Sequence, residues 1–346
     1  MQDYPTTPIP QKEEIIKEGR NNSKLIKIAL TLILLVLLIV IYFVYQNKKD
    51  GDIENAQASV LSQAIPLNEN ENFGVYKGQG GGLYSNNTNQ PTLSHRVALQ
   101  KQIQLVKPLD SKGVSDSSGK VGFIYLGDPF TKGDFETLSD FIEENSVINQ
   151  RLRLVDGSEE RFDTSYWEKS IYSWEALSQK VIENDLEQKQ IQILWINLSY
   201  KEYQDNLSED INNQTNVLQT IIKNALVKFP NIRIVYLSSP RNASNSTNAE
   251  YVEPNAFEAA FAIRELINRQ EKGELKFKED IPSLLSEPVM IWGPYLWTRE
   301  SDSSYGPESF SADGLTFTTL GRQKSAVEMF EFWSNYEFSR DWFVSK

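Results

Sequence analysis

The sequence has no cysteine and a single histidine, His95, among its 346 residues. The missing cysteines exclude disulfide bonds, zinc–thiolate sites and thiol nucleophiles, and one imidazole leaves little scope for histidine chemistry. We therefore expect neither a bound metal nor a cofactor. Basic residues are also in deficit, because 35 Lys and Arg stand against 47 Asp and Glu, a formal net charge of −12. A chain this acidic is not expected to bind a nucleic-acid backbone.

Several common catalytic motifs are missing as well. The sequence contains no G-x-S-x-G, Walker A, H-E-x-x-H or G-x-G-x-x-G pattern. Nucleotide-binding and zinc-protease functions therefore have no support in the sequence.

One long apolar run dominates the N-terminal region. Residues 28–45 carry no charge over 18 positions, and about 20 apolar helical residues span a bilayer. Five basic residues precede the run between positions 12 and 27, and only Lys48 and Lys49 closely follow it. The positive-inside rule then places the N-terminus in the cytoplasm. A cleaved signal peptide is the alternative, but its apolar core would be shorter and its cleavage site closer than residues 56–58.

The sequence thus predicts four segments of a single-pass cell-membrane protein. They are a cytoplasmic tail (1–24), a transmembrane signal anchor (25–46), a polar stalk (47–72) and an extracytoplasmic domain (73–346). An extracytoplasmic domain of this size without cysteine is typical of a bacterial surface.

From residue 120 onward, strand-like apolar runs alternate with amphipathic helical runs. Such alternation predicts an α/β fold with a parallel five-stranded sheet and helices on both faces. Ligands of such sheets bind at the carboxyl ends of the strands, so we expect the site at residues 127–131, 197–201, 238–241 and 292–297. The predicted strands are 121–126, 151–156, 191–198, 232–239 and 288–295. The predicted helices are 132–145, 166–185, 208–229, 254–273 and 320–335.

Several runs of the chain, in order, resemble a group of bacterial secreted proteins with the fold of the SGNH/GDSL hydrolases. These hydrolases are esterases and lipases with a flavodoxin-like sheet, and the resemblance covers about residues 73–346. The runs that carry it include GGLYSNNTNQPTLSH (81–95), GKVGFIYLG (119–127), KFPNIRIVYLSS (228–239), WGPYLW (292–297) and SADGLTFTTLGRQK (311–324).

The resemblance implies a site at these strand ends. In SGNH hydrolases a serine nucleophile follows a Gly-Asp pair after the first strand, and a late Asp-x-x-His supplies the orienting carboxylate and the base. Gly127 and Asp128 match the Gly-Asp pair, but Pro129 stands at the serine position. Asp313 matches the late aspartate, but Thr316 stands at the histidine position. Proline has no hydroxyl and threonine is no base near neutral pH, so the triad is expected to be degenerate.

The oxyanion hole of these enzymes uses a glycine after the second strand and an asparagine after the third. Asn197 and Tyr200 both remain possible at the asparagine position, and Gly157 is the nearest glycine. Thr131 is a hydroxyl close enough in sequence to replace the missing serine.

Each candidate also has a purely structural interpretation. Asp128 either belongs to the catalytic loop or satisfies backbone donors at a helix start. Asp313 either binds a substrate hydroxyl or shapes an Asp-Gly turn. His95 either takes part in catalysis or packs as a neutral group against the sheet edge. The aromatic residues Trp292, Tyr295 and Trp297 either stack on sugar rings or fill the core.

Three functions remain open at this point. The leading one is a membrane-anchored SGNH-like protein with a degenerate triad that binds a glycan or another envelope component at the cell surface. The second is an active esterase or deacylase on envelope polysaccharide or lipid that uses Thr131, Ser238 or Ser239 with Asp313 and His95. The third is a non-catalytic structural or assembly protein.

Overall fold

The chain divides into two units, Met1–Gln63 and Ala64–Lys346. The predicted tail, the predicted anchor except Tyr42, and most of the predicted stalk lie outside the described residues. Within the described part, no helix combines the length and apolar character needed to cross a membrane. The computed structural model describes Tyr42 and residues 66–69, 75–143, 145–159, 162–200, 206–241, 246–247, 251, 254–296 and 305–345.

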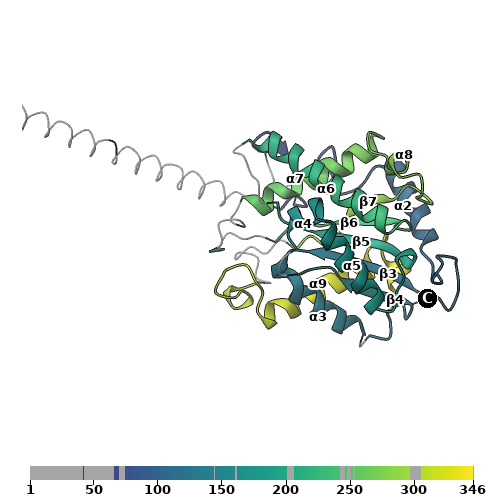
Figure 1. Ribbon diagram of the computed structural model, residues 1–346. Coiled ribbons are helices and arrows are strands. Elements are labelled where there is room, and N and C mark those ends of the chain that lie inside the picture. The colour runs from purple at the N-terminus through teal and green to yellow at the C-terminus, as the bar shows by residue number, and fades with distance from the viewer. Residues whose placement is uncertain are drawn as a thin grey trace, which may run out of the picture. The chain divides into compact units, whose positions relative to one another are not determined.

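The second unit is built around a five-stranded, fully parallel sheet (Figure 1). Its order is β4-β3-β5-β6-β7, which is the 2-1-3-4-5 order of flavodoxin-like folds. The predicted parallel five-stranded α/β sheet is confirmed. The strands are β3 (Val121–Gly127), β4 (Leu152–Asp156), β5 (Ile191–Asn197), β6 (Ile234–Leu237) and β7 (Val289–Trp292).

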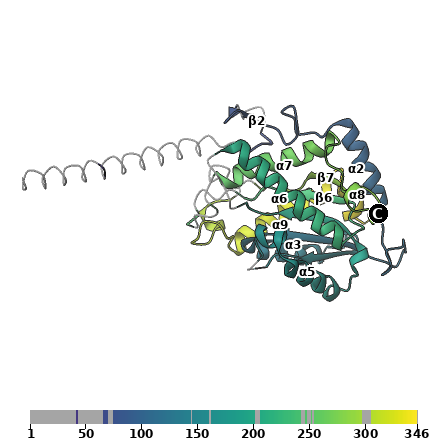
Figure 2. The same cartoon turned by 45° about the horizontal axis from the view of Figure 1, so that its top comes forward.

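Helices cover both faces of this sheet. The chain connects β3 to β4 in one direction along the sheet and β4 towards β7 in the other. Because crossovers between parallel strands are right-handed, the two sets of connecting helices lie on opposite faces. Two helices pack together on one face, and four on the other (Figures 1 and 2). The first pair is α3 (Lys132–Glu143) and α9 (Thr319–Asn335). The second set is α4 (Thr164–Lys169), α5 (Ile171–Glu183), α6 (Leu207–Lys228) and α7 (Asn255–Glu271).

Smaller elements complete the unit. A β-hairpin of two-residue strands precedes a helix that packs against β6 and β7. The hairpin is β1 (Val75–Tyr76) and β2 (Gln79–Gly80), and the helices are α2 (Leu93–Leu105), α8 (Phe277–Asp280) and α10 (Arg340–Phe343). Three 3₁₀ turns are η1 (Pro129–Thr131), η2 (Gln188–Gln190) and η3 (Pro307–Ser309).

The central strands are apolar because both of their faces are covered. Every residue of β3 is buried, as a central parallel strand requires, whereas β4 at the edge is only partly buried. Trp333 of α9 is fully buried at the centre of an aromatic cluster on one face. Its ring centroid lies 4.8–5.8 Å from those of five other aromatic rings: Phe123, Trp195, Tyr236, Phe332 and Trp342.

One predicted helix is two helices. The sequence suggests a continuous helix over 166–185, but α4 ends before Ser170 and α5 begins after it. Ser170 has extended backbone angles, and the hydroxyl of Ser173 donates to the carbonyls of Tyr166 and Ser170. Serine side chains that bond to nearby carbonyls compete with helical pairing, which is why the apolar period alone did not reveal the break.

Leu67 belongs to the packed unit although it falls in the predicted stalk. Its side chain is fully buried, and its carbonyl accepts a hydrogen bond from the Gly82 amide at 2.6 Å. The part of the chain that packs against the sheet domain therefore begins before residue 73.

Candidate functional site

Asp128 is fully buried at the carboxyl end of β3. Its Oδ2 atom accepts hydrogen bonds from the Ser199 amide at 2.7 Å and the Ser199 hydroxyl at 2.6 Å. Ser199 follows β5, and β3 and β5 are neighbours at the point where the strand order changes direction. Asp128 therefore ties together the two loops between which ligands of such sheets bind.

Pro129 is the first residue of η1, which leads into α3. Proline suits this position because its fixed φ is helical and it has no N–H to leave unpaired. The hydroxyl of Thr131 donates to the Asp128 carbonyl at 2.7 Å and accepts from the Tyr125 hydroxyl at 2.8 Å. Thr131 is also buried. Its proton is thus held by a backbone carbonyl rather than by a base.

Asp313 and Thr316 lie against each other. One carboxylate oxygen of Asp313 accepts from the Thr316 hydroxyl at 2.6 Å, and the other accepts from the amides of Leu315 and Thr316. Partial burial raises the pKa of Asp313, but these hydrogen bonds outweigh it and hold the pKa below its ordinary value. Gly314 adopts a φ of +67°, so the segment is also the Asp-Gly turn that the sequence suggests.

The two serines after β6 are both buried and hydrogen-bonded. The Ser238 hydroxyl accepts from the Trp195 indole at 2.8 Å, and the Ser239 hydroxyl donates to the Ala256 carbonyl at 2.7 Å. Their contacts are with core groups, and a serine needs a neighbouring base to act as a nucleophile.

His95 lies on α2 at the opposite edge of the sheet from β4. Its Nε2 atom is 2.7 Å from the Met290 carbonyl of β7, and burial lowers the pKa of its imidazole. Three strand spacings separate β7 from β3, about 14 Å at the usual spacing. The structure thus places His95 against the sheet edge, away from Asp128.

The candidate oxyanion groups lie near the expected strand ends. Asn197 is the last residue of β5, and its side-chain oxygen is buried with no hydrogen-bond partner among the described residues. Tyr200 is buried in the following loop. The Gly157 amide donates to the Tyr125 carbonyl at 2.8 Å, so this N–H is occupied within the sheet.

Of the three aromatic residues, Trp292 is a packed side chain. It is 2% exposed, and its indole N–H donates to the Leu83 carbonyl at 2.5 Å. The Tyr295 ring lies 5.4 Å from it, and the Tyr295 hydroxyl accepts from the Leu67 amide. Trp297 falls outside the described residues.

An ion pair that the sequence did not reveal lies among these loops. Arg241, just after β6, bonds to Asp134 in the first turn of α3, and both side chains are buried. The Arg241 guanidinium lies 3.6 Å from the centroid of the Phe317 ring, a cation–π contact. Burial lowers the pKa of Arg241 to about 10, which still leaves it charged at neutral pH. The pair connects the loop after β6, the start of α3 and the segment before α9.

Asp156 is the last residue of β4, and the pKa of its carboxyl is shifted. Burial raises its pKa to about 6, against the opposing hydrogen bonds from Ser158 and the charge of Lys180, while Glu136 raises it further. The Ser158 amide and hydroxyl lie 2.8 and 2.5 Å from its Oδ1 atom.

We expect Asp156→Asn to stabilise the protein at pH 7 by about 1–3 kcal/mol. The unfolded carboxyl loses its proton near the ordinary value of 3.8, and the folded one only near 6. Between these two pH values the folded state holds more protons than the unfolded state. The contribution of Asp156 to the free energy of unfolding therefore falls as pH rises. Asparagine keeps an acceptor for Ser158 without the buried charge. Urea unfolding at pH 4, 5, 6 and 7 measures this, and a variant with the wild-type pH slope would contradict it.

Comparisons with known proteins add little to this geometry. No protein-family model matches the sequence, and no curated protein matches it. One similar solved structure is that of a "putative acylhydrolase" from Bacteroides fragilis, with 14% sequence identity and a TM-score of 0.33. The match covers 70% of this chain and 97% of that one. A likeness this weak decides nothing about the site, and the fold assignment rests on the strand order.

Proposed function

We propose that this protein is a membrane-anchored, extracytoplasmic SGNH hydrolase-like protein that binds a glycan or another envelope component without cleaving it. The observation that carries the proposal is Pro129, which starts η1 where the resemblance expects the serine nucleophile. A ring without a hydroxyl at that position cannot form an acyl intermediate.

The surrounding hydroxyls support the same conclusion. Thr131 donates to a backbone carbonyl, and Thr316 donates to Asp313 in place of a histidine. The chain's one histidine bonds to the carbonyl of an edge strand. No described serine or threonine at these strand ends is bonded to an imidazole, which the standard mechanism needs.

Binding without cleavage suits the carboxylate of Asp313. Its lowered pKa keeps it ionised at neutral pH, and an ionised carboxylate accepts hydrogen bonds from sugar hydroxyls. The uncharged run at 28–45 and its basic N-terminal flank support an anchored domain outside the cytoplasm.

A hydrolysis assay tests the proposal. We expect the full chain in detergent micelles to release no p-nitrophenol from short-chain esters above the uncatalysed rate, and a fluorophosphonate probe to label no residue. Asp313→Ala, which removes the family-matched carboxylate, is the paired variant. Ester turnover that Asp313→Ala abolishes would overturn the proposal and favour the active hydrolase with a rearranged site.

A further inference from the structure

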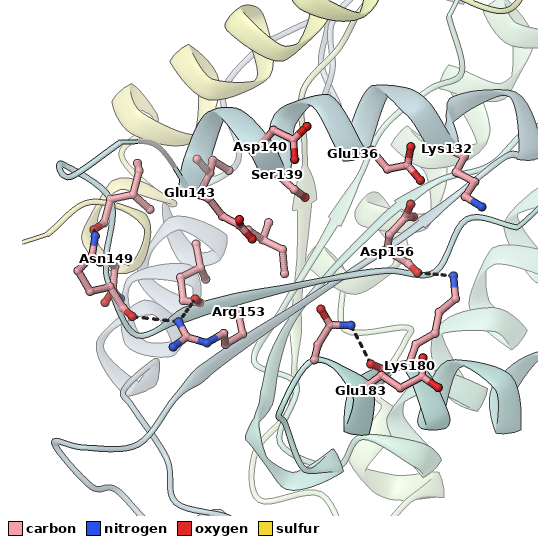
Figure 3. A pocket seen from close by; sticks show the side chains of 16 residues that line it. Lys132, Glu136, Ser139, Asp140, Glu143, Asn149, Arg153, Asp156, Lys180 and Glu183 are labelled. Atoms are coloured by element: carbon pink, nitrogen blue, oxygen red, sulfur yellow. Dashed lines mark hydrogen bonds between the residues drawn. The ribbon is translucent and has the colours of Figure 1, made fainter.

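A groove of about 740 Å³ runs along the outer edge of β4, between α3 and α5 (Figure 3). Carboxylates of α3 lie on one side of the strand, and Lys180 and Glu183 of α5 lie on the other. The groove is separate from the Asp128 and Asp313 loops, and its floor is an edge strand.

The backbone of β4 is partly open on this side, at Leu154. The Val121 amide donates to the Arg151 carbonyl, and the Gly157 amide donates to the Tyr125 carbonyl, so odd-numbered residues of this stretch pair with β3. Because successive residues of a strand point their backbone groups to opposite sides, Leu152, Leu154 and Asp156 face the groove. Arg153 covers the Leu152 carbonyl and Lys180 the Asp156 carbonyl. Among the described residues, none bonds to the Leu154 amide or carbonyl from this side.

The other edge of the same sheet is closed. The Gln270 side chain donates to the Pro288 carbonyl and accepts from the Met290 amide. His95 bonds to the Met290 carbonyl, and Gln102 donates to the Glu287 carbonyl. Native proteins normally block an edge strand in such ways, because an unblocked edge is a template for another strand. The contrast marks the β4 edge as one left accessible for pairing.

The charged side chains that line the groove indicate which kind of partner it would bind. Glu136, Asp140 and Glu143 occupy one face of α3 at helical spacing, all three exposed, and none forms an ion pair with a described residue. The groove also holds three cations, and two of them are engaged, since Arg153 covers backbone carbonyls and Lys180 pairs with Glu159. The third is Lys132 at the start of α3, one positive charge against the three carboxylates of that helix. The unengaged charge beside the open backbone is therefore predominantly negative.

We infer that this groove binds an extended polypeptide segment carrying lysine or arginine, which adds as a sixth strand beside β4. Backbone hydrogen bonds to Leu154 would supply the pairing, and the α3 carboxylates would select basic side chains, which point to alternate sides of an added strand. The half-buried Leu154 side chain offers apolar contact in the same place. The inference does not depend on whether the Asp313 site binds a glycan.

Peptide titration tests the inference on the full chain in detergent micelles. The probe is a fluorescent seven-residue peptide of alternating valine and lysine, and its binding is followed by anisotropy. One comparison peptide is N-methylated at alternate residues, which removes the donors of one edge. The other replaces lysine with glutamate. We expect each comparison peptide to bind about tenfold more weakly or worse.

A charge variant separates the groove from general attraction by an acidic protein. Glu136→Gln, Asp140→Asn and Glu143→Gln together should weaken binding of the lysine peptide about tenfold at low salt. The matched control carries the same charge change elsewhere, at three exposed residues: Glu274→Gln, Glu279→Gln and Asp280→Asn. It should bind like the wild type.

Three results would overturn the inference. They are no binding of the lysine peptide at 1 mM, equal affinity for the N-methylated peptide, or equal weakening by the control variant. The first excludes a site for such segments, the second excludes strand pairing, and the third excludes recognition by the α3 carboxylates. None of them bears on ester hydrolysis or on Asp313.

Discussion

Arg241→Met is expected to lower the free energy of unfolding by about 3–5 kcal/mol. The side chains of Arg241 and Asp134 are 5% and 7% exposed, so removal of the guanidinium leaves a buried carboxylate without its counter-ion. The variant also loses the stacking of the guanidinium on Phe317. Urea unfolding at neutral pH, followed by tryptophan fluorescence, measures the change.

A double-mutant cycle separates the ion pair from the packing. Asp134→Leu combined with Arg241→Met replaces the pair by apolar side chains, and we expect the double variant to be more stable than Arg241→Met alone. Strictly additive losses would contradict a coupled pair. Lys223→Met is the exposed control, because Lys223 and Asp280 pair at the surface and its loss should change stability little.

Trp333→Ala is expected to lower the free energy of unfolding by about 3–5 kcal/mol. Trp333 is fully buried and contacts the aromatic rings of β3, β5 and β6 beneath the candidate site. The substitution leaves a large cavity that rigid neighbouring rings cannot easily fill. Guanidinium unfolding followed by circular dichroism avoids the loss of a fluorophore.

A control on the same helix tests whether the effect comes from burial. Val327 of α9 is 42% exposed, and Val327→Ala should cost less than about 1 kcal/mol. If Trp333→Ala lowered the free energy of unfolding no more than Val327→Ala does, the result would contradict a central role of the indole in the core.

The sheet was predictable because burial on both faces produces continuous apolar runs. The run at 121–126 corresponds to β3, where each residue is buried. Helix α2 was not predictable from periodicity. In α2, Leu99 and Ile103 are buried four residues apart, but Val97 and Leu105 are 47% and 45% exposed, which obscures the apolar face.

The contacts of the candidate site were not predictable from the sequence. The resemblance to SGNH hydrolases places Pro129 and Thr316 at the serine and histidine positions of those enzymes, and this assignment stays a prediction. The Arg241–Asp134 pair joins residues 107 positions apart, and neither lies in a recognisable motif. Only the crossovers of the sheet bring the two side chains together.

The unequal edges of the sheet limit how this protein can assemble. A filament in which the sheets of successive copies join edge to edge needs two free edges on each subunit, one for each neighbour. Because Gln270 and His95 bond to the outer backbone groups of β7, the five-stranded sheet has one edge left for pairing among the described residues. Backbone pairing through this sheet would therefore stop at a single added chain or a closed dimer, so its β4 edge can stay open without extending the sheet from copy to copy.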